Sequence, residues 1–233
     1  MGLKGQDNVE SKKIFLRGFL SGLYLSLVVS MYLIVLNTID NSKVISSFLF
    51  SFALLLIVGK GYYLYTGKVG YLLPYKKGNF KMVLITILSN ILGIIITGLL
   101  LGFANISELS NYASNLVYSK FELKMWYESF ILAMFCGVLM YTAVDGYDKI
   151  NNNVIKVLVV ILSVMTFLLA GFEHSVANIV YIVLAKEFSF KILGYLILMI
   201  IGNGIGAITI NIIHSKIDQW WSIFIFKYIL KMI

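Results

Sequence analysis

The chain has 233 residues, of which 60% are hydrophobic and 13% are charged, and its formal net charge is +8 at pH 7. These fractions and a mean hydropathy of +0.90 lie far from the averages of soluble globular domains, so they indicate an all-α integral membrane protein with no soluble domain. The basic residues are dispersed among short polar segments without a soluble binding module, so we expect no nucleic acid as a partner.

Six apolar stretches are each long enough to cross a hydrocarbon core of about 30 Å, for which a helix needs about 20 residues. We therefore expect six transmembrane helices, at residues 15–36, 44–66, 82–103, 126–144, 154–185 and 190–213. Polar breaks at residues 59–67 and 171–174 predict that the second and fifth helices are interrupted. Residues 1–14 are then an N-terminal segment, residues 15–213 the membrane domain, and residues 214–233 an amphipathic tail that lies at the membrane surface.

The lysine and arginine residues are distributed unevenly between the two sides of these six spans. With the N-terminus in the cytoplasm, the outside receives only Lys43, Lys120, Lys124, Lys186 and Lys191, and most of the other basic residues fall inside. The positive-inside rule therefore predicts a multi-pass protein with both termini in the cytoplasm. The low proline content and the abundance of Ile, Lys and Asn suggest an AT-rich bacterial genome, so we expect the inner (cell) membrane of a bacterium to hold the chain.

Glu173 and His174 lie side by side within the fifth apolar stretch. An ionisable side chain inside a membrane segment is costly and normally faces a cavity, a partner or a transport path, so we expect function here. The alternative is a histidine that only forms a hydrogen bond with a neighbouring helix.

A weak internal repeat connects the two halves of the chain. Asn90-x-x-Gly93 in the third span matches Asn203-x-x-Gly206 in the sixth, and an interrupted helix precedes each of them. Three spans per half would invert one half relative to the other. This 3+3 arrangement predicts two broken helices that enter a central site from opposite faces of the membrane.

Three segments resemble the formate/nitrite transporter family. Residues 171–178, GFEHSVAN, are similar to the family's histidine signature after the break in its fifth helix. Residues 61–67, GYYLYTG, resemble its G-A-E-L-F-T-G segment in the second helix, and residues 202–207, GNGIGA, resemble its G-N-x-x-G-G in the sixth. The resemblance covers residues 15–213. It departs at Tyr63, where the family usually has Glu, and at Met140 and Tyr141, where it commonly has Cys-Asn.

The resemblance implies an aquaporin-like six-helix protomer that assembles as a homopentamer in the lipid bilayer, with a pore for small monovalent anions in each protomer. Lys124 falls within about one residue of a lysine that the family places beside the pore. Phe50 and Leu54 lie sixteen and twelve residues before Thr66, and Phe167 lies seven residues before His174, where the family places apolar constriction residues. The expected constriction residues are Phe50, Leu54, Leu64, Tyr65 and Phe167.

The broken helices suggest how an anion is attracted without a full positive charge. A half-helix that starts inside the membrane presents unpaired N–H groups and the positive end of its dipole. The Thr66 hydroxyl and the Asn203 amide would add donors at the centre, although such residues also commonly bridge helices. Gly171 and Glu173 would support the bend, with the carboxylate accepting backbone N–H bonds, because a free carboxylate in the path would repel an anion.

His174 has two possible roles. As a neutral imidazole it would donate a hydrogen bond to the passing anion, and as a proton donor it would let a weak acid cross the apolar constriction in its neutral form. Protonation explains more, because a bare anion would pay several kcal/mol to leave water. Formate, nitrite, hydrosulfide and similar anions all fit, and the sequence does not choose among them.

Other function classes remain as alternatives. A hydrolase could use His174, Ser175 and Glu173, but adjacent residues on one helix point in different directions and no G-x-S-x-G or H-E-x-x-H motif is present. We therefore expect no enzyme, no catalytic residue, no cofactor and no metal site. A non-transporting membrane scaffold or sensor on a degenerate transporter fold would explain the departures from the family pattern. A channel for uncharged solutes is the other alternative.

Overall fold

The computed structural model describes residues 3–104, 106 and 108–232, and the side chains of residues 9–104, 106 and 108–219. The described residues form α-helices, one 3-10 helix and connecting turns, with no strand among them. The helices are α1 (Leu3–Thr38), α2 (Lys43–Gly59), α3 (Tyr65–Lys68), the 3-10 helix η1 (Val69–Leu72), α4 (Asn79–Phe103), α5 (Leu109–Phe121), α6 (Trp126–Lys149), α7 (Asn153–Leu169), α8 (Ser175–Ala185) and α9 (Phe190–Met232).

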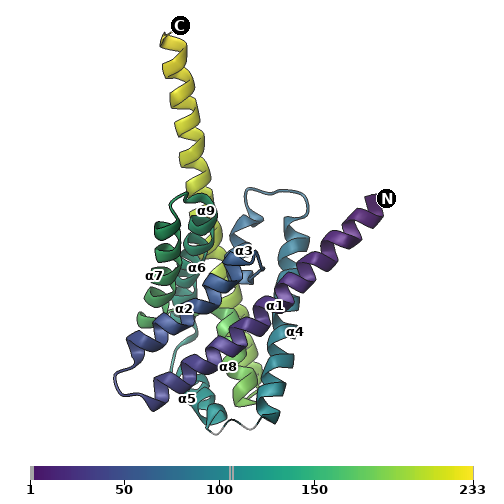
Figure 1. Ribbon diagram of the computed structural model, residues 1–233, viewed down its shortest axis with the longest axis vertical. Coiled ribbons are helices and arrows are strands. Elements are labelled where there is room, and N and C mark those ends of the chain that lie inside the picture. The colour runs from purple at the N-terminus through teal and green to yellow at the C-terminus, as the bar shows by residue number, and fades with distance from the viewer. Residues whose placement is uncertain (1–2, 105, 107, 233) are drawn as a thin grey trace.

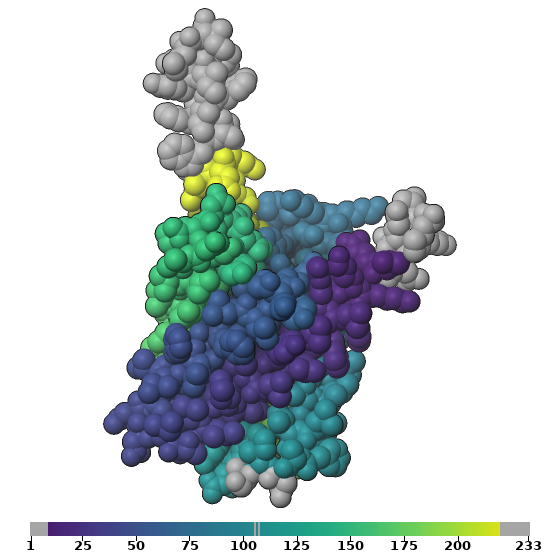
Figure 2. All heavy atoms as spheres, in the orientation of Figure 1, coloured from purple at the N-terminus to yellow at the C-terminus, as the bar shows by residue number. Residues whose placement is uncertain are grey.

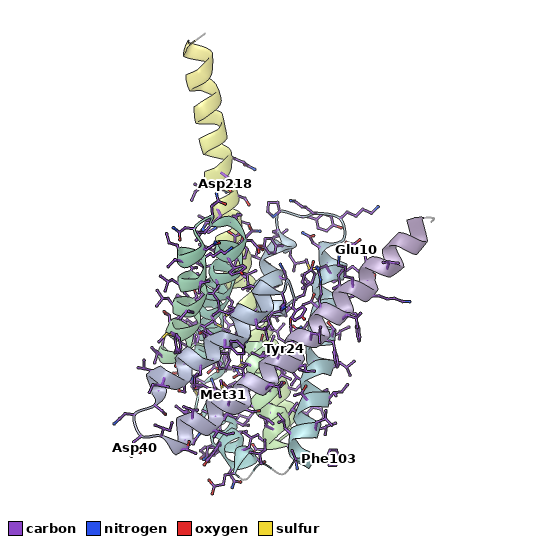
Figure 3. All side chains as sticks on the ribbon, in the orientation of Figure 1. Glu10, Tyr24, Met31, Asp40, Phe103 and Asp218 are labelled. Atoms are coloured by element: carbon purple, nitrogen blue, oxygen red, sulfur yellow. The ribbon has the colours of Figure 1, made fainter. Side chains whose placement is uncertain are left out.

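Different helices lie at the two ends of the helical body (Figure 1). The start of α1 and the end of α9 lie toward one end, and α5 lies at the opposite end. Glu10 and Asp218 mark the first end, and Asp40 and Phe103 mark the other (Figure 3). Seen from the side drawn in Figure 2, α1 and α2 run diagonally across the face of the molecule. We call the end with Glu10 and Asp218 the terminal end and the other the α5 end.

Four helices are long and apolar enough to cross a membrane, over Val9–Thr38, Asn79–Phe103, Trp126–Lys149 and Phe190–Gln219. They contain the expected spans 15–36, 82–103, 126–144 and 190–213. The other two expected spans are not single helices. Residues 44–66 are divided between α2 and α3, and residues 154–185 between α7 and α8, with a non-helical segment in each. In addition, α5 is a helix that we did not expect.

Both of these breaks have the same local geometry, and a glycine causes it. Gly61 and Gly171 adopt positive φ angles of 64° and 72°, which L side chains rarely adopt. The residue after each glycine donates its N–H to a carbonyl in the last helical turn, at Ile57 and Phe167. This is the hydrogen-bond pattern of a Schellman C-cap, so α2 and α7 end in the same way.

Glycines let two pairs of helices touch through their backbones. A β-carbon on Gly22 of α1 would lie 2.2 Å from the carbonyl oxygen of Asn90 in α4, and one on Gly206 of α9 would lie 1.9 Å from that of Met134 in α6. No side chain fits at either place. Packing through small residues is typical of membrane helices, and here it fixes the pairs α1–α4 and α6–α9 on either side of the two breaks.

The C-terminal tail continues the last expected span without a turn, because α9 extends to Met232. The side chains of residues 220–233, on which the expectation of an amphipathic surface helix depends, lie outside the described residues.

Candidate functional site

The two helix breaks meet at Thr66 and His174. Thr66 lies in the first turn of α3, His174 is the residue before α8, and both are buried. Their side chains are hydrogen-bonded, with 3.0 Å between Thr66 Oγ1 and His174 Nε2. From this contact α3 leads toward the terminal end and α8 toward the α5 end (Figure 1). The N-terminal ends of both short helices therefore face the centre of the molecule.

The hydrogen bonds of His174 select one tautomer of the neutral imidazole. Nδ1 accepts the backbone N–H of Ala177 at 3.1 Å, so this nitrogen carries a lone pair. The proton of a neutral ring is then on Nε2, which donates to the Thr66 hydroxyl oxygen. A second proton on Nδ1 would require that the first turn of α8 release this contact. The arrangement thus presents one N–H donor, on Nε2, at the centre.

Two aromatic rings pack beside this histidine. The Phe167 ring lies 5.5 Å from the His174 ring, and the Phe50 ring packs edge-on against Phe167 at 5.8 Å between centroids. Both phenylalanines are buried, and so is Leu54 one turn after Phe50 on α2. The structure therefore brings Phe50 and Phe167 together beside the histidine, from the two helices that end at the breaks.

The two remaining constriction candidates, Leu64 and Tyr65, lie at the start of α3. Tyr65 is buried, and its hydroxyl donates to the backbone carbonyl of Ile200 in α9 at 3.0 Å. Leu64 is buried directly before α3 and lines a cavity of about 180 Å³. The five expected constriction residues are all buried, and their role in narrowing a pathway stays a prediction.

Glu173 is fully buried, and side chains rather than backbone groups satisfy its carboxylate. Oε2 accepts from Lys120 at 2.7 Å and from Asn178 at 2.8 Å, and Oε1 accepts from Lys124 at 2.5 Å. The expected acceptance of backbone N–H bonds is therefore wrong in its partners. One carboxylate compensated by two ammonium groups leaves this cluster with a net positive charge, close to His174 on the α5 side.

Sequence reasoning missed Lys120 as part of this cluster, because its segment was interpreted as a loop. It lies in the last turn of α5, and its side chain is 15% exposed, against 28% for Lys124. A signal was present: the buried residues of α5 recur at helical spacing, namely Leu109, Ala113, Val117 and Phe121. A helix over these residues would have placed Lys120 in its last turn, a few residues before Lys124.

Asn203 holds the backbone of the second break. Its side-chain oxygen accepts the N–H of Ser175 at 2.9 Å, and its amide nitrogen donates to the carbonyls of Ala133 at 2.7 Å and Glu173 at 2.9 Å. Both amide hydrogens are therefore occupied by backbone oxygens. In this structure Asn203 positions the start of α8 and has no donor left for the centre, in contrast to what we expected.

Asn90 does the same for the first break. Its oxygen accepts the N–H of Tyr65 at 2.9 Å, and its amide nitrogen donates to the carbonyls of Gly18 at 2.8 Å and Tyr63 at 2.9 Å. The repeat that connects Asn90 with Asn203 in the sequence thus has a structural counterpart, because each asparagine bridges a broken segment to the preceding long helix.

Among the described residues, no group of three or more His, Cys, Asp or Glu side chains could hold a metal ion.

Comparison with known proteins identifies relatives of this arrangement. The sequence pattern of the family described as formate/nitrite transporter matches residues 4–215. No curated protein matches the sequence significantly. Among solved structures, the chain is similar to a "Pentameric formate channel with formate bound" at a TM-score of 0.75 and 21% identity, covering 93% of this chain and 98% of the other. It is also similar to an "FNT family ion channel" at a TM-score of 0.79 and 19% identity, covering 94% of this chain and 92% of the other.

Proposed function

Since this chain belongs to the formate/nitrite transporter family, we propose that it carries small monovalent anions of weak acids, such as formate, nitrite or hydrosulfide, through a pore in each protomer. The family and the similar structures are transporters and channels, so the chain is a membrane transport protein and not an enzyme. The observation that carries the proposal is the buried contact of Thr66 with His174 between two helix breaks.

We further propose that the protomer has six membrane spans in a 3+3 inverted repeat. In this arrangement α2 with α3 and α7 with α8 are the interrupted second and fifth spans, and the matching contacts of Asn90 and Asn203 support the inversion. The body, residues 15–213, then lies between an N-terminal segment and a C-terminal tail that are both in the cytoplasm of a bacterium, with the spans in its inner membrane.

A homopentamer is the proposed assembly, because one similar structure is a pentameric formate channel. Large apolar side chains on the outward faces of the long helices are consistent with burial against lipid and neighbouring protomers. Among the described residues these include Leu88 and Leu99 on α4 and Phe135 on α6, which are all more than half exposed.

The proposed pathway passes His174 and Thr66, with Lys124 on the α5 side and Leu64 on the terminal side. Phe50, Leu54 and Phe167 narrow it next to the histidine, and Tyr65 fixes the wall through its bond to α9. Gly171, Glu173 and Asn203 hold the break in shape. The two short helices start at the centre, and the positive ends of their dipoles favour negative charge there, while Asn90, Asn203 and His174 accept N–H groups of their first turns.

Of the two roles considered for His174, the neutral hydrogen-bond donor is the one that the geometry supports. The N–H on Nε2 can be shared between the Thr66 oxygen and an anion, and the Thr66 hydroxyl can turn its hydrogen toward that anion, without any change in the backbone. A role as proton donor needs a proton on Nδ1 as well, and the Ala177 N–H opposes it. We therefore propose that the anion is held at Nε2–H and Thr66, and that protonation at His174 requires a rearrangement of the first turn of α8.

The test is flux of formate, nitrite and hydrosulfide into proteoliposomes, for the unaltered protein and for His174→Asn. We expect flux of at least one anion, and a loss of about tenfold or more in the variant. The matched control is His214→Asn. This histidine of α9 is partly exposed and lies near Asp145 of α6, so its replacement should leave the flux unchanged. If assembled protein carries no anion at all, the transport proposal is wrong, and a scaffold or a pore for uncharged solutes takes its place.

A further inference from the structure

We propose that Arg17 and Lys68 form an anion-binding site around Tyr63, on the terminal side of the pathway, for a planar anion with two oxygen atoms such as a small carboxylate or nitrite. The inference rests on the proposed function, because it adds a first binding station to the same route.

Tyr63 and Glu173 occupy equivalent positions in the two breaks. The backbone carbonyl of each accepts a hydrogen bond from an asparagine amide, at 2.9 Å in both cases. Lys68 follows Tyr63 at the same spacing at which Asn178 follows Glu173. The two halves therefore place different side chains at matching sites: Tyr63 and Lys68 in the first break, and Glu173 and Asn178 in the second.

The charges at the two sites are balanced in different ways. Around Glu173, a buried carboxylate accepts from both lysines and from Asn178. Around Tyr63 the central group is a neutral ring, with the Arg17 guanidinium 5.3 Å and the Lys68 ammonium 5.0 Å from its centroid. A cation held by an aromatic face keeps its full charge and most of its donors.

Neither of these cations is paired with a carboxylate within 4 Å in the described part of the chain. Arg17 Nη1 donates to the Tyr63 hydroxyl at 3.4 Å, and Lys68 also lies 5.4 Å from the ring centroid of Tyr71. The acidic residue that lines the same cavity is Asp148, which is exposed to solvent at the end of α6. Two cations with free donors thus face a cavity whose acid is screened by water.

The cavity has a suitable size and position. Its volume is about 180 Å³, and a water molecule takes about 30 Å³ in the liquid, so an anion of a few heavy atoms fits together with part of its hydration shell. Its walls include Gly61, Leu64 and Gly67, so it adjoins the break and the first turn of α3. Thr66, which contacts His174, is in that turn.

The donors define the chemical class of the ligand. The guanidinium fork can bind two oxygens of one planar anion in parallel, which an ammonium group alone cannot do. Lys68 adds a point charge, and the Tyr63 hydroxyl can donate its hydrogen while its oxygen accepts from Arg17. Hydrosulfide has a single sulfur atom and cannot accept two parallel N–H bonds on separate atoms, so the site favours carboxylates and nitrite over hydrosulfide.

The test measures equilibrium binding of ¹³C-formate to the full-length protein in detergent, by line broadening. We expect the dissociation constant to rise about tenfold in Arg17→Gln, Lys68→Asn and Tyr63→Glu. The third variant removes no cation; it supplies a carboxylate that both cations can bind, as at Glu173. Lys60→Gln is the matched control, because Lys60 is exposed at the end of α2 and does not line the cavity. Hydrosulfide should compete with formate weakly.

Unchanged formate binding in assembled Tyr63→Glu and in the double variant Arg17→Gln/Lys68→Asn would overturn the site. Binding in detergent does not depend on transport, so the two proposals fail separately. Proteoliposomes that carry no anion, made from protein that binds formate in this way, would overturn the proposed function and leave the site standing.

Discussion

Asn90 and Asn203 make equivalent sets of three hydrogen bonds, one set at each break in the helical body. In each case the oxygen accepts the first N–H of a short helix, and the amide nitrogen donates to one carbonyl in the broken segment and one in the preceding long helix. The equivalence means that the two halves of the protein position their short helices by the same device. The side chains around the breaks are then free to differ.

The hydrogen bonds of Asn90 and Asn203 predict a loss of stability in Asn203→Asp and in Asn90→Asp. Each aspartate keeps the acceptor but loses two donors to buried carbonyls, which costs about 1–3 kcal/mol for each carbonyl left without a partner. The measurement is thermal unfolding of the assembled protein in detergent. Asn151→Asp, at an exposed turn position, is the control and should unfold like the unaltered protein. Equal unfolding temperatures for all four proteins would contradict the clamping role.

The buried ion pairs predict that Glu173→Gln is strongly destabilising. Removing one partner of a buried ion pair typically costs about 3–5 kcal/mol, because charge is left without compensation. Adding Lys120→Gln to this variant should recover part of the loss, since it removes one of the two uncompensated ammonium groups. Unfolding of both variants in detergent measures the effect. A double variant less stable than Glu173→Gln alone would show that repulsion between the lysines is not the cause.

The contact between Thr66 and His174 predicts that Thr66→Val reduces anion flux while Thr66→Ser preserves most of it. Valine has nearly the same shape but removes the oxygen that accepts from Nε2–H, and with it one polar partner of the anion. A loss of about tenfold is expected in proteoliposome flux. Thr38→Val is the control, because this threonine lies exposed at the end of α1. Full flux in Thr66→Val would remove the hydroxyl from the pathway.

The bond from Ala177 to Nδ1 predicts that Ala177→Pro gives the transporter an acid-dependent flux component. Proline has no N–H and puts a carbon in its place, so the His174 ring must turn away from the first turn of α8, and Nδ1 then becomes free to take a proton. Flux measured from neutral to acid pH should rise more steeply than in the unaltered protein. The added component should disappear when His174→Asn is combined with Ala177→Pro. The same steep rise in the unaltered protein would show that the Ala177 contact does not hold the ring neutral.

The conformation of Gly171 predicts that Gly171→Ala lowers stability by about 1 kcal/mol or more, because alanine is strained at a φ of 72°. A β-carbon there would meet nothing within 4 Å, so the loss would come from the backbone alone. Gly194→Ala is the matched control: it also has open space around it, but it lies inside α9 at an ordinary angle, where alanine favours the helix. Thermal unfolding should move in opposite directions for the two variants.

The sequence predicted the places of the breaks better than it predicted their surroundings. The backbone conformation at positions 61 and 171 favours glycine, so each break could be predicted from its own segment of the sequence. The asparagines were visible as a repeat, but their role was not, because Asn203 could donate to a ligand or to a carbonyl with equal chemical sense. Only the proximity of Ala133 and Glu173 decides between these.

Contacts that depend on how helices rotate and pack could not be predicted. The contact of the Tyr65 hydroxyl with Ile200 depends on the rotation of α3, a single turn that Asn90 and α9 hold in place. The pairing of Lys120 with Glu173 depends on the docking of α5 against α8, and no local pattern fixes that contact.

The glycine contacts between the long helices restrict how this protein can move. The carbonyl oxygens of Asn90 and Met134 lie against Gly22 and Gly206. If one helix slid along its partner, a residue with a side chain would replace the glycine and collide with the carbonyl. The helices α1 and α4, and likewise α6 and α9, are therefore expected to move as one rigid pair. We therefore expect that an anion is admitted by side chains and by the short segments at the two breaks, and not by sliding within a helix pair.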